Sequence, residues 1–168
     1  MQDTSKPSSP DIFGQAMKAY YYHQDPEEII VHSPDFDDDI IPVAYLFRSY
    51  DQMPPIEQIA LSHCSGKVLD VGCGAGSHSL YLQEDRQLKV TAIDTSLGAI
   101  EVSRLRGVRQ TQQIAFQDFQ GDQFDTLLFL MNGTGIIGRL KQIDEFFTKI
   151  RQVLHPDGQV LIDSSDLS

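Results

Sequence analysis

Cysteines and basic residues are scarce in this sequence, and it contains no long hydrophobic run. Two cysteines in 168 residues are too few for a disulfide-stapled scaffold and predict a reduced, cytoplasmic protein. The apolar runs are far shorter than the ~20 residues that a membrane-spanning helix needs. The N-terminus is polar and lacks the apolar core of a signal peptide. We therefore expect no membrane association.

The shortage of basic residues leaves a strongly acidic chain. It has 13 Lys and Arg against 24 Asp and Glu, a formal net charge of −11. Nucleic-acid binding generally requires a basic face, so no nucleic-acid partner is expected. The first fifty residues hold nine of the acids and only three bases. We predict an acidic N-terminal arm over residues 1–50, with a short helix near residues 12–22, followed by one domain over residues 51–168.

From residue 67 onward, short apolar runs alternate with amphipathic ones. Strands that alternate with helices indicate βαβ units and a parallel sheet. The sequence therefore predicts an α/β fold with a doubly wound, mostly parallel sheet. The expected strands span residues 67–72, 88–94, 113–118, 124–132 and 160–165, and the expected helices span residues 77–85, 97–107 and 138–154.

A glycine-rich segment, Asp70 to Gly76, joins the first of these strands to the following helix. Glycines allow a sharp turn and let a ligand approach the backbone, while the helix N-terminus offers free N–H groups. The same glycines could also serve the turn alone. The dinucleotide fingerprint is Gly-x-Gly-x-x-Gly, but here the third glycine comes one residue early and Ser77 takes its place. This spacing disfavours a nicotinamide cofactor.

The pattern Asp-x-Gly-x-Gly-x-Gly resembles motif I of the class I S-adenosylmethionine-dependent methyltransferases. The resemblance covers about residues 43–165, and its finer detail is similar to an uncharacterised bacterial branch of the family. It implies a Rossmann-like fold that binds S-adenosylmethionine and releases S-adenosylhomocysteine. In the motif itself, it implies cofactor contacts from Asp70, Gly72, Cys73, Gly74 and Gly76.

Further cofactor contacts are implied at the ends of the next two strands. Asp94 ends the second strand, where a carboxylate can accept hydrogen bonds from both ribose hydroxyls; it could instead cap the next helix. Thr95 follows it. The resemblance places Asp118 on the adenine amino group and Phe119 beside the ring, although Asp118 could also be a solvated loop acid.

Two more candidates lie outside these strand ends. Arg48 is the only cation between Lys18 and Lys67, and the resemblance implies that it pairs with the cofactor's carboxylate; a surface arginine is the alternative. Asn132 follows the fourth strand at the sheet's switch point, where ligands bind, or it simply forms a turn. The segment after it lacks the two prolines and the aromatic residue of enzymes that methylate nucleobase or glutamine amino groups.

The family's sheet has two further strands, which form an antiparallel hairpin at its end. This sequence stops soon after the fifth expected strand. We therefore expect about five strands with the terminal hairpin, strands six and seven, missing. An uncovered strand edge exposes unpaired N–H and C=O groups, so we expect the N-terminal arm or a second copy of the chain, as in a homodimer, to cover it.

The resemblance implies a methyltransferase that acts on a small-molecule acceptor. Methyl transfer is an in-line displacement in which the protein mainly positions the acceptor. No catalytic residue is therefore assigned, and no metal is expected because the histidines and cysteines lack metal-ligand spacing. Three alternatives remain open: a non-catalytic S-adenosylmethionine-binding module, an NAD-dependent oxidoreductase, and an aminopropyl transferase.

Overall fold

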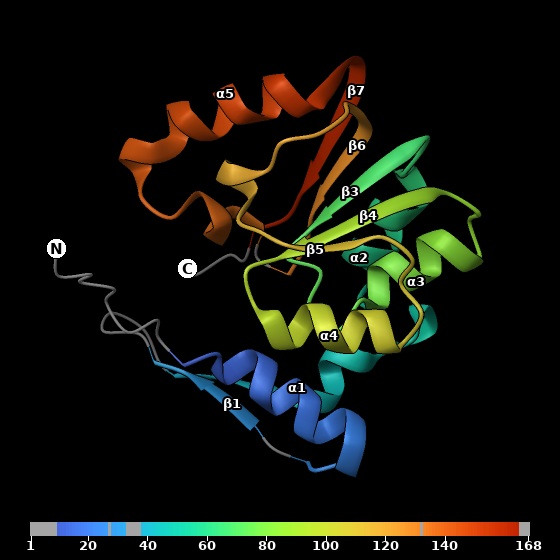
Figure 1. Ribbon diagram of the computed structural model, residues 1–168, viewed down its shortest axis with the longest axis vertical. Helices are drawn as coiled ribbons and strands as arrows, with labels where there is room; N and C mark the ends of the chain where they lie inside the picture. Colours follow the sequence, from blue (N-terminus) through green and yellow to red (C-terminus); the bar gives the residue numbers. More distant parts are fainter. Residues whose placement is uncertain (1–9, 27, 33–37, 132, 165–168) are drawn as a thin grey trace, which may run out of the picture.

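The computed structural model describes residues 10–26, 28–32, 38–131 and 133–164. None of the helices in these residues is long and apolar enough to cross a membrane. The helices, 3-10 helices (η) and strands follow one another in this order (Figure 1): α1 (Ile12–His23), β1 (Glu28–Val31), β2 (Asp39–Pro42), η1 (Val43–Phe47), η2 (Tyr50–Gln52), α2 (Pro55–His63), β3 (Lys67–Val71), α3 (Ser77–Glu84), β4 (Lys89–Asp94), α4 (Leu97–Leu105), β5 (Thr111–Gln113), η3 (Phe116–Asp118), β6 (Phe124–Phe129), η4 (Gly133–Ile137), η5 (Leu140–Gln142), α5 (Ile143–Val153) and β7 (Leu154–Ile162).

The main sheet confirms the predicted α/β architecture. Its five strands are all parallel and lie in the order β5-β4-β3-β6-β7. The central strands β3 and β6 are buried on both faces, as their nearly continuous apolar sequences require. The chain runs outward from β3 to β5 and then returns to β6 on the other side. The strand order therefore reverses between β3 and β6, and ligands bind at the carboxyl ends of strands at such a point.

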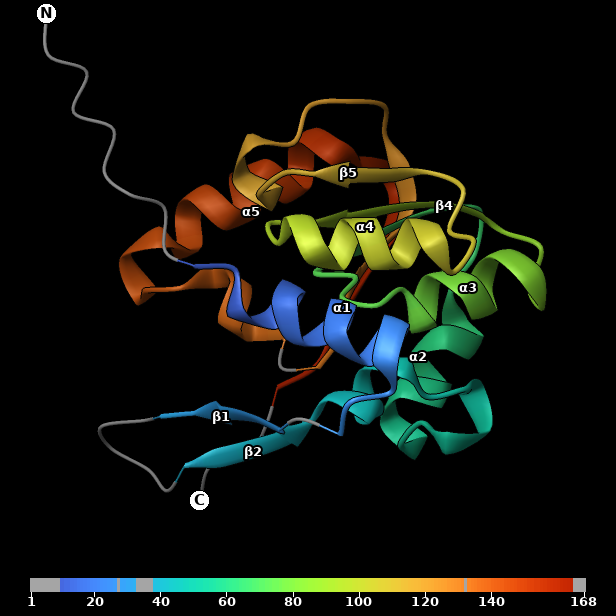
Figure 2. The ribbon, with the colours of Figure 1, turned by 60° about the horizontal axis from the view of Figure 1, so that its bottom comes forward.

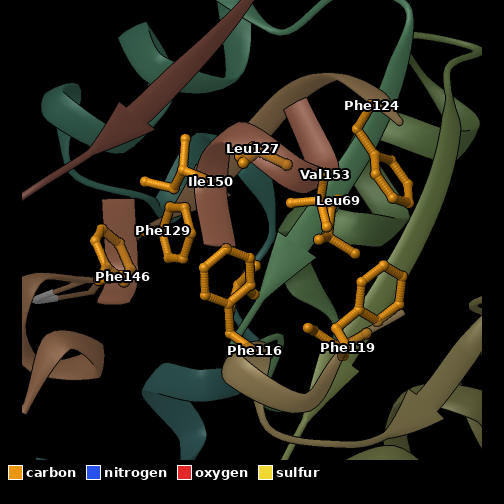
Figure 3. Packing of buried hydrophobic residues seen from close by; sticks show 11 residues of the cluster. Leu69, Phe116, Phe119, Phe124, Leu127, Phe129, Phe146, Ile150 and Val153 are labelled. Atoms are coloured by element: carbon orange, nitrogen blue, oxygen red, sulfur yellow. The ribbon is translucent and has the colours of Figure 1, made fainter. Parts of the chain in front are cut away.

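One face of the sheet carries an aromatic core beneath α5. The rings of Phe116, Phe129 and Phe146 pack together with centroids 5.1 to 5.6 Å apart (Figure 3). Leu69 and Leu127 point into the same cluster from β3 and β6. Alternate residues of a strand face opposite sides, so the neighbouring side chains of these strands pack on the other face, beneath α2 and α3.

The helix α1 of the N-terminal segment packs on α4. Figure 2 shows α1 between α4 and the β1–β2 hairpin, and these elements share a cluster that includes Met17, Ile29 and Val102. Glycines permit this close contact, because a Cβ built on Gly98 would lie 2.5 Å from the Cα of Gly14. The segment is therefore attached to the domain along its helix, whereas the predicted domain boundary near residue 50 stays a prediction.

Asp11 joins the first turns of these two helices. Its Oδ1 accepts a hydrogen bond from the Gly14 N–H at 2.9 Å, and its Oδ2 accepts bonds from Ser96 Oγ and the Gly98 N–H, both at 2.9 Å. One carboxylate thus satisfies free N–H groups at the starts of both α1 and α4. This arrangement fixes the beginning of α1 against the loop that follows β4.

The expectation of missing strands six and seven needs a correction. The described residues contain seven strands and one antiparallel hairpin, but β1 and β2 form that hairpin in a sheet of their own within the N-terminal segment. The sequence interpretation treated this stretch as irregular because its prolines and acids obscure the short apolar runs Glu28–Val31 and Asp39–Pro42. Among the described residues no strand pairs with the outer edge of β7. Its covering by a second copy stays a prediction.

Three element boundaries also differ from the prediction. The third strand of the sheet spans Thr111–Gln113, and Phe116–Asp118 forms a 3-10 turn. The last strand begins at Leu154, because the segment expected to be a turn already runs beside β6. The last helix begins at Ile143 after two 3-10 turns. The first of these shifts matters for function, because it changes which residues end the strand.

We expect Gly98→Ala to lower the free energy of unfolding by about 1–3 kcal/mol, because the new methyl group would overlap the backbone of α1. Alanine in a helix normally stabilises by up to about 1 kcal/mol relative to glycine. A loss of stability would therefore indicate the overlap with α1. Urea denaturation of both proteins measures the change. Gln15→Ala on the exposed side of α1 is the control and should change stability little; an unchanged or more stable Gly98→Ala protein contradicts the packing.

Candidate functional site

A cavity of about 970 Å³ lies where the carboxyl ends of the central strands meet the N-terminal segment. Its walls come from the glycine loop after β3, the loop after β4, the segment that follows β6, and residues of α1 and the hairpin. This is the predicted switch point of the sheet. Six of the sequence-predicted site residues line the cavity: Arg48, Gly72, Cys73, Gly74, Asp94 and Thr95.

The glycine loop presents open backbone to the cavity. Gly72 and Gly74 have φ angles of +77° and +52°, which favour glycine. A Cβ built on Gly74 would meet no atom within 4 Å, and one on Gly72 would first meet Ile136 Cδ1 at 3.5 Å. The loop is held from behind, because the N–H groups of Gly72 and Cys73 donate to the Ile93 carbonyl at 2.9 and 3.1 Å. A ligand can therefore lie directly against this backbone.

The third glycine serves packing. A Cβ on Gly76 would lie 2.8 Å from Val108 Cγ2 and 3.0 Å from Ser103 Cβ. Its absence lets the start of α3 approach α4 and the loop after it. Gly76 is not among the residues that line the cavity, so its contribution to a ligand is to shape the loop.

Asp94 connects two loops of the site. Its Oδ2 accepts a hydrogen bond from the Gly74 N–H at 2.9 Å, and its Oδ1 accepts one from the Ser96 N–H at 2.9 Å. Burial raises the pKa of Asp94, and these N–H donors oppose the rise. Each carboxylate oxygen can accept a second hydrogen bond. Because Asp94 also lines the cavity, its remaining acceptor positions are available to a ligand.

A buried ionic group forms another wall. Glu57 Oε2 accepts hydrogen bonds from Arg48 Nη2 and from His78 Nε2, the latter at 2.7 Å. All three side chains are more than nine-tenths buried. Burial acts to raise the pKa of Glu57, but the hydrogen bonds from His78 and Arg48 outweigh it and hold the pKa below its usual value. Arg48 and His78 line the cavity, and Glu57 supports them from behind.

The Arg48 guanidinium keeps a donor in reserve. Its Nη1 donates to the Tyr45 carbonyl at 2.5 Å, and the group lies 3.9 Å above the Tyr45 ring. Its Nε is buried and has no acceptor within the described part of the chain. Nη1 and Nη2 each carry a second N–H group, and because Arg48 lines the cavity, these are the donors that it can offer to a ligand.

Asp70 lies beneath the glycine loop and outside the cavity wall. It is 1% exposed, and its Oδ2 accepts a hydrogen bond from Ser79 Oγ at 2.6 Å. Burial raises the pKa of Asp70. Its observed contact is therefore with α3, and any influence on a ligand would act through the loop above it.

The predicted adenine contacts are located elsewhere. Asp118 is exposed and Phe119 packs in the aromatic core, and neither lines the cavity. The reason is the shifted boundary of β5, which ends at Gln113. Gln113 lines the cavity, and its Nε2 donates to the Thr95 carbonyl at 3.1 Å. The strand therefore ends at the cavity with the amide of Gln113, whereas the sequence predicted the carboxylate of Asp118 at its end.

Asn132 lies outside the described residues, but both of its neighbours line the cavity. Asp163 holds this turn, because its Oδ2 accepts from the Met131 N–H at 2.9 Å and its Oδ1 from the Gly133 N–H at 2.8 Å. Met131 has a φ of +62°, which is unusual for a residue with a side chain. Asp163 thus fixes Met131 and Gly133 at the edge of the cavity.

The far wall of the cavity is mostly apolar and belongs to the N-terminal segment. Several of its side chains are more than one-third exposed although they are apolar. Within the described residues there is no group of His, Cys, Asp and Glu side chains suited to a metal ion. The apolar residues of the far wall are Ile12, Phe13, Met17, Ile29, Ile30 and Ile41.

Sequence reasoning missed Glu57, Gln113 and the whole far wall. A correct end for the third strand would have identified Gln113, because ligand-binding residues follow strand ends. Glu57 had no such signal. It lies in α2, and only the tertiary structure brings it to Arg48 and His78.

Comparison with known proteins identifies the family. The model of a family described as a methyltransferase domain matches residues 69–162. A solved S-adenosylmethionine-dependent methyltransferase from Bacteroides fragilis, in complex with S-adenosylhomocysteine, is 46% identical, with a TM-score of 0.88 over 96% of this chain and 68% of that chain. No curated protein matches the sequence.

More distant structures share the fold. DesVI from Streptomyces venezuelae is 16% identical with a TM-score of 0.58, over 90% of this chain and 56% of that one. A methyltransferase from Thiobacillus denitrificans, also in complex with S-adenosylhomocysteine, is 22% identical with a TM-score of 0.51, over 64% of this chain and 47% of that one. This chain thus spans about two thirds of the Bacteroides protein and about half of the other two. Its sequence, fold and glycine loop together establish that the chain belongs to the S-adenosylmethionine-dependent methyltransferases, with S-adenosylmethionine as cofactor.

Proposed function

We propose that the cavity holds S-adenosylmethionine along the glycine loop, with its ribose on Asp94. The observation that carries this placement is the Asp94 carboxylate, which lines the cavity at the end of β4 with unused acceptor positions. Two ribose hydroxyls are donors of the kind that these positions accept. The open space beside Gly74 supports close passage of a ligand along the backbone.

The two ends of the cofactor then follow from the chemistry of the walls. Gln113 lies beyond Asp94 and can offer an amide to the polar edge of adenine. Arg48 and His78 lie on the other side of the glycine loop, and the cavity-lining Arg48 guanidinium supports binding of the cofactor's carboxylate there. Asp118 and Phe119 have no place in this arrangement.

When bound, the cofactor supplies a methyl group on a positively charged sulfur, which makes the methyl carbon open to in-line attack. The chain's contribution is to orient both reactants and to exclude water. The N-terminal segment supports exclusion, because its helix and hairpin form the wall opposite the sheet. Asp11 also lines the cavity, but its oxygens already cap two helices, so we do not assign it as a base for the acceptor.

We propose a small acceptor with an apolar body. The wall away from the proposed cofactor contacts consists mainly of isoleucines from α1, β1 and β2, joined by Phe13 and Met17. Exposed apolar side chains that surround a cavity mark a binding surface for apolar ligands.

Cys64 and Cys73 are buried free thiols, which supports a reducing, cytoplasmic location.

The first test of the cofactor placement is isothermal titration with S-adenosylhomocysteine, beside NAD. We expect the wild-type protein to bind S-adenosylhomocysteine and not NAD. Asp94→Ala should weaken that binding roughly 100-fold or more, because it removes a carboxylate that accepts two hydroxyl bonds. Asp122→Ala is the control, since Asp122 is an exposed acid paired with Lys67. Unchanged affinity in Asp94→Ala, or preference for NAD, would contradict the placement.

The second test uses the glycine loop. Gly74→Ala should fold but bind S-adenosylhomocysteine at least about tenfold more weakly, because its methyl group enters the space proposed for the cofactor. Gly107→Ala is the matched control. Gly107 also has a positive φ, +111°, so both variants carry backbone strain, but Gly107 lies outside the cavity wall. Titration of both variants separates the effect of filling the cofactor space from the effect of backbone strain. Equal affinities of the two variants for S-adenosylhomocysteine would contradict the proposed contact with Gly74.

The third test concerns the acceptor. In an assay of S-adenosylhomocysteine formation with small amines, phenols and thiols, we expect turnover of members with an alkyl or aryl body. Ile30→Asp should raise the KM of such an acceptor roughly tenfold, because it places a charge in an apolar wall. Ile40→Asp is the control, since Ile40 is exposed to the same extent, 53% against 52%, and does not line the cavity. Equal KM values, or turnover of charged acceptors only, would exclude this acceptor class.

A further inference from the structure

We infer that Glu57 is a positioning residue, which aims the Arg48 guanidinium at the carboxylate of the cofactor. The inference rests on the proposed placement of the cofactor's amino-acid end beside Arg48 and His78. Glu57 itself is 4% exposed and does not line the cavity, so it can act on a ligand only through its two partners.

One carboxylate oxygen of Glu57 accepts the hydrogen bonds from both of its partners. Both hydrogen bonds, from Arg48 Nη2 and from His78 Nε2, end on Glu57 Oε2. The three residues come from separate segments, since Arg48 follows η1, Glu57 lies in α2 and His78 lies in the first turn of α3. A single oxygen on α2 therefore fixes two cavity-lining side chains relative to the start of α3 and the glycine loop before it.

The donor count shows what this fixation leaves free. A guanidinium has five N–H donors, and the bonds to Tyr45 and Glu57 use one N–H each of Nη1 and Nη2, which leaves a further N–H on each nitrogen at the edge of the guanidinium. A carboxylate binds such an edge through two parallel hydrogen bonds, which require the guanidinium plane to be correctly oriented. The bond to Glu57 Oε2 sets that orientation.

The charges are also matched. The hydrogen bonds from His78 and Arg48 hold the pKa of Glu57 below its usual value, and its carboxylate balances the charge of the buried Arg48 guanidinium. The amino-acid end of the cofactor is a zwitterion with no net charge. The cavity therefore needs an oriented donor here more than an additional positive charge, and a positioning role predicts that the place of the Glu57 oxygen matters more than its charge.

Two variants of Glu57 separate place from charge. Glu57→Asp keeps the charge but withdraws the carboxylate by about 1.5 Å, one bond length along the side chain. Glu57→Gln removes the charge but keeps an oxygen that can accept both bonds. The ligands are S-adenosylhomocysteine and 5′-methylthioadenosine, which has the same nucleoside but lacks the amino-acid end. Titration of each protein with both ligands gives two Kd values. The Kd of 5′-methylthioadenosine divided by the Kd of S-adenosylhomocysteine measures how much the amino-acid end contributes to binding.

We expect Glu57→Asp to weaken S-adenosylhomocysteine binding roughly tenfold, the effect of losing one hydrogen bond to a charged group, while 5′-methylthioadenosine binding stays within about twofold. Glu57→Gln should keep both affinities within about threefold. Arg48→Lys should lower the ratio of the two Kd values, because lysine lacks the planar, forked donor group of arginine. Glu84→Asp, an exposed position on α3, is the control and should leave both affinities unchanged.

Each other outcome overturns the inference. Equal weakening of both ligands, or a Glu57→Asp protein that does not fold, would show that Glu57 serves the fold alone. A loss in Glu57→Gln without a loss in Glu57→Asp would show that charge matters and place does not. If wild-type protein binds both ligands equally and Arg48→Lys changes neither, the proposed placement of the cofactor fails first. That result is distinct from a failure of Glu57 alone.

Discussion

The hydrogen bonds to Asp94 are the interactions on which the site depends. One carboxylate accepts N–H groups from the glycine loop after β3 and from the start of α4 after β4, so two neighbouring crossovers keep a fixed separation at the carboxyl end of the sheet. Burial raises the pKa of Asp94, and hydrogen bonds from backbone N–H groups oppose the rise. A residue that binds a ligand in this position must also hold the loops between which the ligand lies.

The N-terminal segment is attached to the same framework. Asp11 accepts from Ser96 Oγ and the Gly98 N–H, directly beside the loop that Asp94 holds. Further along, Arg106 Nη1 donates to the Ala75 carbonyl at 2.6 Å and its Nη2 to the Phe47 carbonyl at 3.3 Å. Burial lowers the pKa of Arg106, and these carbonyls together with the Phe47 ring compensate the buried charge. The N-terminal segment is thus held to the loop after β4 at its start, and Arg106 joins its later part to the glycine loop.

Much of the fold could be predicted from the sequence, because apolar periodicity and glycine spacing are local signals. The run from Lys67 to Gly76 sufficed for a strand, a turn and a helix start, and the alternation of strands with helices sufficed for a parallel sheet. The predicted end of the third strand was wrong because β5 is only three residues long, too short to give a period, and the adenine contacts placed at that end stay a prediction. The hairpin was hidden by its prolines and acids. Glu57 could not be found at all, since its partners are 9 and 21 residues away in sequence.

The contact between α1 and α4 restricts how this sequence can vary. A methyl group on Gly14 would lie 2.2 Å from Asp11 Oδ2 and 2.6 Å from Ser96 Oγ, and one on Gly98 would lie 2.5 Å from the Gly14 backbone. Neither glycine can therefore gain a side chain while the other helix stays where it is. Related sequences that keep the Asp11 cap should retain small residues at both positions, and those that lose one glycine should lose the other and the acid with it. In an alignment, we expect these three positions to vary together.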